Sequence, residues 1–186
     1  MPAQGVTPMH AKTHRGALLV EGDPRELFLG IFLSEAVAKE ISSFRRWHNQ
    51  PWSRDQIGAF TIATEEISHF HYLVHHAARA RQVSQLELEL QGEIDKFLLT
   101  FFANYRKDER LFEALFEQLF YHFSLATHLS AEEKARYQAA NDLAKRFIRK
   151  HARALIDQRA SLEGVFRLLR RFYRLDIPEK VSLIAA

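Results

Sequence analysis

The chain has no cysteine among its 186 residues. A disulfide framework, a thiolate metal site and a cysteine nucleophile are therefore excluded, and nothing indicates an oxidising compartment. Long apolar runs are also missing, because the longest one, residues 27–33, is far shorter than the roughly 20 residues that a membrane span needs. We therefore expect a cytoplasmic protein without membrane insertion.

Glycine and proline are scarce, with 7 and 5 residues, and neither gathers into a motif. The glycines form no phosphate-binding loop and no dinucleotide fingerprint. No Gly-x-Ser-x-Gly elbow presents a serine nucleophile. The sequence gives no support to nucleotide binding or hydrolysis, and it favours a protein that is not an enzyme.

Apolar residues, in contrast, make up 47% of the chain, which is enough for one substantial core in a chain of single-domain size. Residues 1–16 are rich in Pro, Gly, Thr and His and show no periodicity. We expect them to form a mobile N-terminal arm, followed by a helical bundle domain over residues 17–186.

Capping boxes mark where helices begin, because a Ser or Asp cap followed three residues later by Glu or Gln satisfies two backbone N–H groups. Full boxes occur at Asp23–Glu26, Ser53–Gln56, Ser84–Glu87 and Ser130–Glu133, and bare caps at Asp108 and Ser161. With the helical spacing of apolar residues, they predict helices over about 24–48, 54–81, 85–105, 109–128, 131–158 and 162–174. The predicted fold is all-α, a single-domain antiparallel bundle of about six helices.

Further predictions concern the first two helices and the C-terminal residues. The first helix is apolar almost all round and should lie near the centre of the bundle. The second should bury a stripe formed by Phe60, Ala63, Ile67, Phe70, Val74 and Ala77. The apolar ending 181–186 should form no helix of its own, and should either fold back over the core or dock on a second subunit.

A histidine-rich segment, residues 64–77, holds four of the ten histidines. Within it, Glu66 and His69 match the Glu-x-x-His spacing that helical di-iron bundles use. Together with Glu40 and Glu93 from other predicted helices, they form a candidate site for Fe, Mn or Zn. The motif occurs once here, whereas such bundles use two, so the metal site is the alternative interpretation.

His71 and His75 form a second candidate metal pair, because residues four apart on a helix share one face. With a carboxylate from a neighbouring helix they could hold Zn²⁺. The interpretation that we favour is simpler: both rings pack against neighbours and form hydrogen bonds with water or backbone.

Glu40 and His151 lie in apolar stripes of their predicted helices. A buried carboxylate needs a partner, so we expect the two side chains to meet, with Glu66 or His71, in a polar spot inside the core. We favour a hydrogen-bond network that fixes helix register over a ligand, proton-transfer or metal site.

Charge is unevenly distributed along the chain. Residues 85–130 hold eight acids against four bases, whereas residues 131–174 hold twelve bases against five acids. The candidate basic surface consists of Lys145, Arg146, Arg149, Lys150, Arg153, Arg170, Arg171 and Arg174. We expect it to serve a homo-oligomer or another protein, with nucleic acid as the second choice of partner.

The favoured function is therefore non-enzymatic: a helical-bundle protein that acts by protein–protein association, in a regulatory or scaffold-like role. The first alternative is a helical metal-binding protein of the ferritin-like di-iron type, or an oxidoreductase, that uses the Glu/His cluster. The second alternative is nucleic-acid binding through the basic C-terminal helices.

Overall fold

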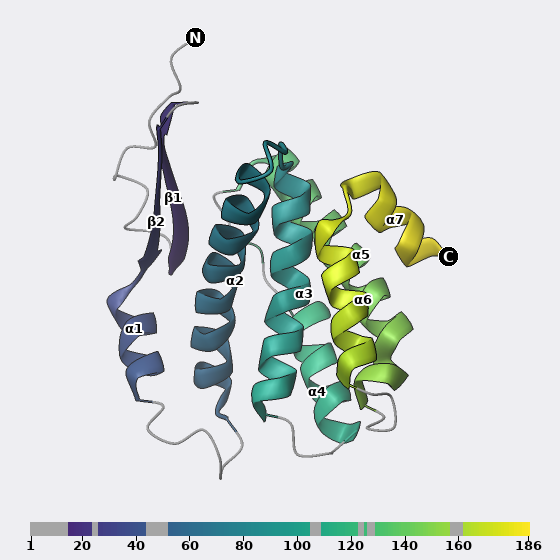
Figure 1. Cartoon of the computed structure of the whole chain (residues 1–186). Helices are drawn as coiled ribbons and strands as arrows, with labels where there is room; N and C mark the ends of the chain where they lie inside the picture. Colours follow the sequence, from purple (N-terminus) through teal and green to yellow (C-terminus); the bar gives the residue numbers. More distant parts are fainter. Residues whose placement is uncertain are drawn as a thin grey trace. The chain divides into compact units, whose positions relative to one another are not determined.

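The structure is a computed structural model that is mostly helical and divides the chain into two compact units, residues 1–82 and 83–186 (Figure 1). It describes residues 15–23, 26–43, 52–104, 109–122, 125, 129–156 and 162–186. The prediction of a mainly helical protein is confirmed, with the addition of a small two-stranded sheet. The predicted arm up to residue 14, the caps at 108 and 161, and parts of the predicted helices, 44–48, 105, 123–124, 126–128 and 157–158, lie outside the described residues.

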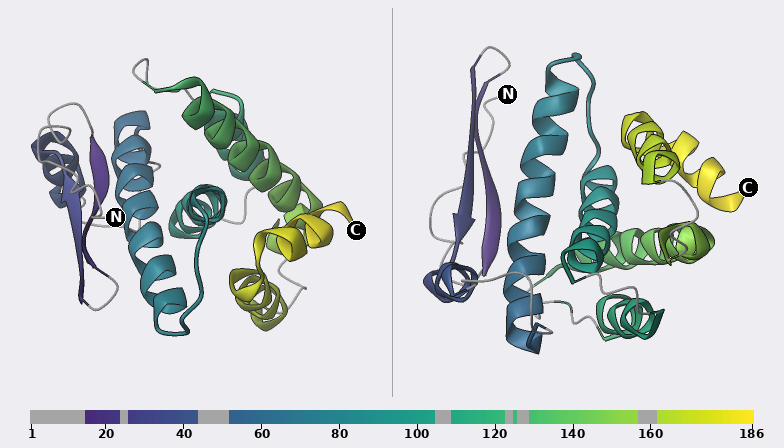
Figure 2. Two further views of the ribbon diagram at one scale, coloured as in Figure 1. Left: turned by 90° about the horizontal axis from the view of Figure 1, so that it is seen from above. Right: turned by 60° about the horizontal axis from the view of Figure 1, so that its bottom comes forward.

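The first unit combines a β-hairpin with two helices. In chain order its elements are β1 (Gly16–Asp23), β2 (Glu26–Leu33), α1 (Glu35–Ser42) and α2 (Arg54–Ala77). The strands are antiparallel, and Leu19 lies opposite Gly30. Both strands and α1 pack against α2 (Figure 2).

The hairpin replaces the first part of the predicted helix over 24–48, and the prediction is wrong for residues 26–33. Asp23 and Glu26, which were predicted to form a capping box, are instead paired backbone to backbone at the end of the two strands. The apolar run 27–33 has no polar helical face, and residues 16–20 give it a strand partner. The helix that does form, α1, starts later, at Ser34, whose Oγ accepts a hydrogen bond from the N–H of Val37 at 3.4 Å.

The predicted core stripe of α2 is wrong at its centre, because Ile67 and Val74 are 44% and 43% exposed. The buried positions of α2 instead include Ser68, Tyr72 and His76. They are polar or amphipathic, and a periodicity that counts only apolar residues does not detect them.

The second unit consists of five helices in its described part. They are α3 (Gln85–Asn104), α4 (Glu109–Phe120), α5 (Ala131–Ile156), α6 (Leu162–Arg174) and α7 (Ile177–Ala185). The predicted boxes cap α3 and α5, since Glu87 and Glu133 accept from the N–H groups of Ser84 and Ser130 at 3.0 and 2.8 Å. α5 packs against α3, α4 and α7 (Figure 2).

Phenylalanines form the centre of this unit. The ring of Phe97 on α3 lies 5.1 Å from Phe112 and 5.6 Å from Phe120, both on α4. Phe147 on α5 lies 4.3 Å from Phe172 on α6. All five side chains are buried, so these contacts join α3 to α4 and α5 to α6.

The C-terminal segment forms a helix, so the prediction that residues 181–186 lack one is wrong. Asp176 and Glu179 build a capping box, with hydrogen bonds of 2.9 and 3.0 Å in the two directions. Pro178 lies in the first turn of α7, where a missing N–H costs no hydrogen bond. The helix that begins at Asp176 carries the apolar ending back onto the unit.

Lys180 anchors α7, since its side chain is 0% exposed. Its Nζ donates to Oε1 of Gln91 on α3 at 3.2 Å and lies 4.8 Å from the ring centre of Phe172 on α6. A buried ammonium needs partners of this kind. Lys180 therefore ties α7 to α3 and α6.

Gly16 marks the closest approach of the hairpin to α2. A Cβ atom there would lie 2.7 Å from Cγ2 of Ile62, so Gly16→Ala should lower the free energy of unfolding by about 1–3 kcal/mol. Gly30→Ala is the matched control, because its Cβ would meet Leu19 at an ordinary 3.8 Å. Denaturant unfolding measures both, and equal losses would contradict the close contact.

Lys180→Ala should lower the free energy of unfolding by about 2–4 kcal/mol, because it leaves a cavity and removes the donor to Gln91. Lys180→Met keeps the volume and should cost less. Lys134, an exposed lysine on α5, supplies the control Lys134→Ala. If the two alanine variants unfold at the same denaturant concentration, the anchoring role is refuted.

Candidate functional site

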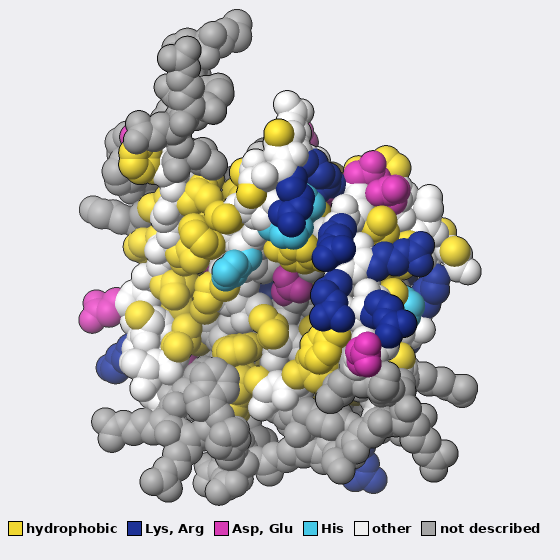
Figure 3. Space-filling view, in the orientation of Figure 1, with side chains coloured by type: hydrophobic (Ala, Val, Ile, Leu, Met, Phe, Trp, Pro, Cys, Tyr) yellow, Lys and Arg dark blue, Asp and Glu magenta, His cyan; other side chains and the backbone are white. Residues whose placement is uncertain are grey.

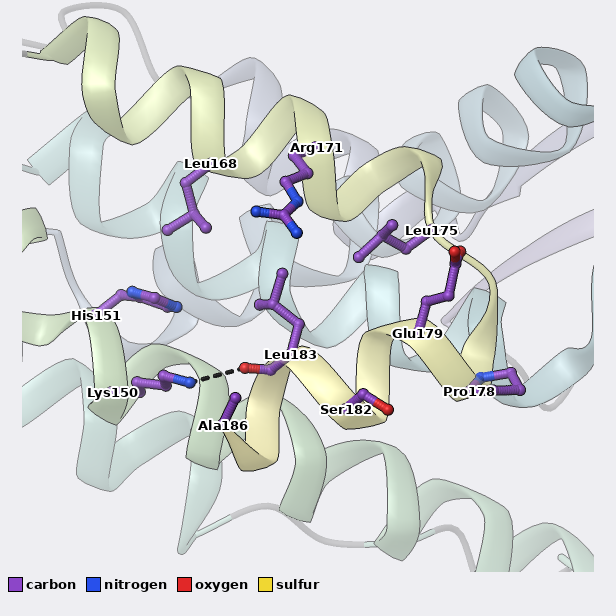
Figure 4. A pocket seen from close by; sticks show the side chains of 10 residues that line it. All are labelled: Lys150, His151, Leu168, Arg171, Leu175, Pro178, Glu179, Ser182, Leu183 and Ala186. Carbon is purple, nitrogen blue, oxygen red and sulfur yellow. Dashed lines mark hydrogen bonds between the residues drawn. The ribbon is translucent and has the colours of Figure 1, made fainter.

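A groove lies between α5, α6 and α7 of the second unit, and it encloses about 710 Å³. Figure 4 shows Leu168 and Arg171 pointing into it from α6 and Leu183 facing them from α7. Pockets for small ligands have roughly 300–1,000 Å³. The groove therefore has the size of a ligand site and stays open along one side.

The groove is cationic as well as apolar. Lys150 on α5 donates from Nζ to the carbonyl oxygen of Leu183 at 2.7 Å, close to the C-terminus of α7, where carbonyl groups lack helical partners. Among the described residues, Arg171 forms no hydrogen bond or ion pair. Glu179 is the one acidic side chain of the lining, and it caps α7.

His151 lies at the side of this groove on α5 and is half-buried. Its ring lies 4.8 Å from Phe147, and its Nε2 is buried with no hydrogen-bond partner among the described residues. Burial, and to a smaller extent the charge of Lys150, lowers the pKa of His151 below its usual value. Both effects favour the neutral form of the imidazole.

Glu40, the expected partner of His151, lies half-buried on α1 of the first unit. The two residues belong to different units, so their meeting stays a prediction.

The second unit contains a polar network that the sequence did not indicate. Gln91 accepts from Lys180 and donates to Oδ1 of Asp95 at 3.0 Å. Burial, with a contribution from Asp95, raises the pKa of Tyr173 to about 12.

Two of the predicted basic residues of α5, Lys145 and Arg149, have acidic partners within the unit. Nη1 of Arg149 lies 2.7 Å from Oε1 of Glu113 on α4. Nζ of Lys145 lies 2.9 Å from Oδ1 of Asp142, and this hydrogen bond lowers the pKa of Asp142. Arg146 is exposed, and the side chain of Arg153 lies outside the described residues.

The arginines of α6 differ from those of α5. Arg170, Arg171 and Arg174 are exposed, and none of them forms an ion pair within the described part of the chain. In the face drawn in Figure 3, Lys and Arg side chains gather over the second unit where α6 runs. The bases of the predicted surface that form no ion pair in this part of the chain therefore include these three on α6 together with Arg146 and Lys150 on α5.

Two histidines near the C-terminus of α2 accept hydrogen bonds from arginines. Nη1 of Arg81 lies 3.0 Å from Nδ1 of His76, and Nη1 of Arg79 lies 3.3 Å from Nδ1 of His75. Because arginine only donates, Nδ1 is the acceptor in both rings. A metal ion at the predicted His71–His75 pair would have to use Nε2 of His75, while His71 itself is exposed.

The other predicted metal ligands are only partly assembled. Nδ1 of His69 lies 3.9 Å from Oε2 of Glu66, and ligand atoms of Glu65 and His69 lie within 4.8 Å of each other. Glu93, in the second unit, pairs with Lys96 at 2.6 Å. Metal binding stays a prediction.

The first unit exposes an apolar surface that the sequence did not indicate, because the hairpin was taken for a helix. Phe28 is 60% exposed, and the other exposed large apolar side chains of this unit are Leu19, Val20, Ile31, Ile67 and Val74. Figure 3 shows hydrophobic side chains gathered over the hairpin and α2. By the strand register, Phe28 and Leu19 lie on one face of the hairpin, whereas Val20 and Ile31 lie on the other. Exposed apolar side chains such as Phe28 and Leu19 are typical of interaction sites.

Comparison with protein-family models, with curated proteins and with solved structures gave no match. No described helix is both long enough and apolar enough to cross a membrane.

The lowered pKa of His151 makes stability depend on pH with a definite sign. As the pH falls below about 6.5, the unfolded chain binds a proton before the folded one does, so the free energy of unfolding should fall. The loss should be complete below the folded pKa, and full stability should return above pH 6.5. Denaturant unfolding between pH 5 and 8 measures it.

His151→Phe keeps an aromatic ring beside Phe147 and removes the titrating group. The stability difference between the parent chain and this variant should therefore change below about pH 6.5 and stay constant above it. The exposed His71→Phe serves as the control for loss of an imidazole. A pH-independent difference for His151→Phe would contradict the effect of burial.

Proposed function

We propose that this is a non-enzymatic protein that acts by protein–protein association, and that a second copy of the chain binds to the apolar surface of the first unit. The observation that carries this proposal is the exposure of Phe28 and its apolar neighbours on the hairpin. Aromatic side chains supply a large part of the binding energy of protein interfaces, and burying Phe28 would contribute about 1.5–3 kcal/mol.

The hairpin also supports self-association through its backbone. β1 and β2 form a two-stranded sheet, and no third strand joins it among the described residues. Each strand therefore keeps one row of N–H and C=O groups outside the sheet, which can pair with another strand. A two-stranded sheet is only marginally stable alone, so added strands would stabilise the hairpin.

A second candidate function is binding of an anionic macromolecule, with nucleic acid as the example. It is supported by the arginines of α6, which lack acidic partners in the described part of the chain. Phosphate groups bind such arginines. Self-association is favoured, because apolar exposure costs free energy in the monomer whereas an exposed guanidinium is well solvated.

Phe28→Asp should shift the equilibrium towards the monomer. In light scattering after size-exclusion chromatography, the parent chain should have a mass above the 21.7 kDa of one copy. The variant should elute as a monomer, because a buried, unpaired carboxylate would weaken the dimer by about 2 kcal/mol or more.

Phe166→Asp is the matched control, since Phe166 is an exposed phenylalanine of α6 in the second unit. It should leave the measured mass unchanged. A parent chain that stays monomeric at high concentration would refute self-association. Equal dissociation by both aspartate variants would place the interface elsewhere.

A further inference from the structure

The groove of the second unit has two walls of leucine side chains. Leu168 and Leu175 come from α6, and Leu183 comes from α7; all three are half-buried. Figure 4 shows them directed towards the same space. An apolar chain lying between them would remove further leucine surface from water, which stabilises a complex by about 25 cal/mol for each Å² buried.

The charged side chains of the groove determine whether it favours an anionic or a cationic ligand. Arg171 points into the space between the leucines and has no ion-pair or hydrogen-bond partner among the described residues. Lys150 uses one of its three N–H donors on the carbonyl group of Leu183. The only acidic side chain of the lining, Glu179, accepts a hydrogen bond from the N–H of Asp176 in the capping box. The groove therefore carries an excess of positive charge.

We propose that this groove binds a small amphipathic carboxylate, with the carboxylate on Arg171 and the apolar chain between Leu168, Leu175 and Leu183. A guanidinium presents two parallel N–H donors that match the two oxygens of a carboxylate. The ligand's chain lies along the groove and stays partly exposed, since one side is open. The site lies on α5, α6 and α7 and does not depend on self-association through the hairpin.

Sodium decanoate is the probe, used as free monomer below the concentration at which it forms micelles and titrated into the full chain by calorimetry. Decanol presents the apolar chain without charge, and acetate presents the charge without the chain. Decanoate should bind at least about tenfold more tightly than either, because only decanoate uses both parts of the groove.

Arg171→Gln should weaken decanoate binding by about tenfold or more, since it removes the charged bidentate donor. Arg170→Gln is the matched control: Arg170 is the neighbouring exposed arginine of α6 and does not line the groove. It removes the same charge and should change the affinity by less than about twofold. Circular dichroism verifies that both variants are folded.

Several results would overturn the proposal. Equal affinity for decanol and decanoate would mean that Arg171 contributes nothing, and equal affinity for acetate would mean a diffuse surface charge. Equal losses for the two glutamine variants would exclude a specific site at Arg171. Because the three probes are compared on the parent chain, the test does not depend on any variant folding. Loss of the dimer in Phe28→Asp would leave decanoate binding unchanged.

Discussion

The burial of Lys180 is the constraint on which the position of the second unit's groove depends. An ammonium group removed from water needs nearby acceptors and aromatic faces, and Gln91 and Phe172 supply them from α3 and α6. These contacts restrict where α7 can lie. Since α7 provides one wall of the groove, including Leu183, the position of that wall follows from a buried charge as well as from apolar packing.

Charge pairing decides which part of the basic C-terminal region remains available for binding. Arg149 of α5 pairs with Glu113 of α4 and also lies over the ring of Phe116 at 3.9 Å, so it contributes to packing. On α6, Arg167 pairs with Glu163 of the same helix at 3.1 Å. That pair is well exposed and contributes little stability. The available positive charge is therefore concentrated further along α6 and at the groove.

Local signals in the sequence predicted local structure well. Ser53, Ser84 and Ser130 begin helices because a capping box needs only four consecutive residues. The same pattern failed at Asp23, where a preceding apolar segment offered strand pairing. It also holds at Asp176, where Pro178 fits the first turn of a helix, although no helix was predicted over residues 181–186.

The sequence did not predict the groove, because the groove depends on how α5, α6 and α7 pack together. In the sequence, His151 interrupts an apolar stripe of its helix. In the structure it lies half-buried beside the groove. The groove itself also needs α7, whose helix was not expected. Arg171 is indistinguishable from Arg170 in sequence, being another base on one strongly amphipathic helix. The two differ only because α5 and α7 pack beside one face of α6. An arginine on that face gains leucine neighbours but, among the described residues, no ion-pair partner. Apolar surface beside an unpaired guanidinium favours an amphipathic anion over a purely polar one.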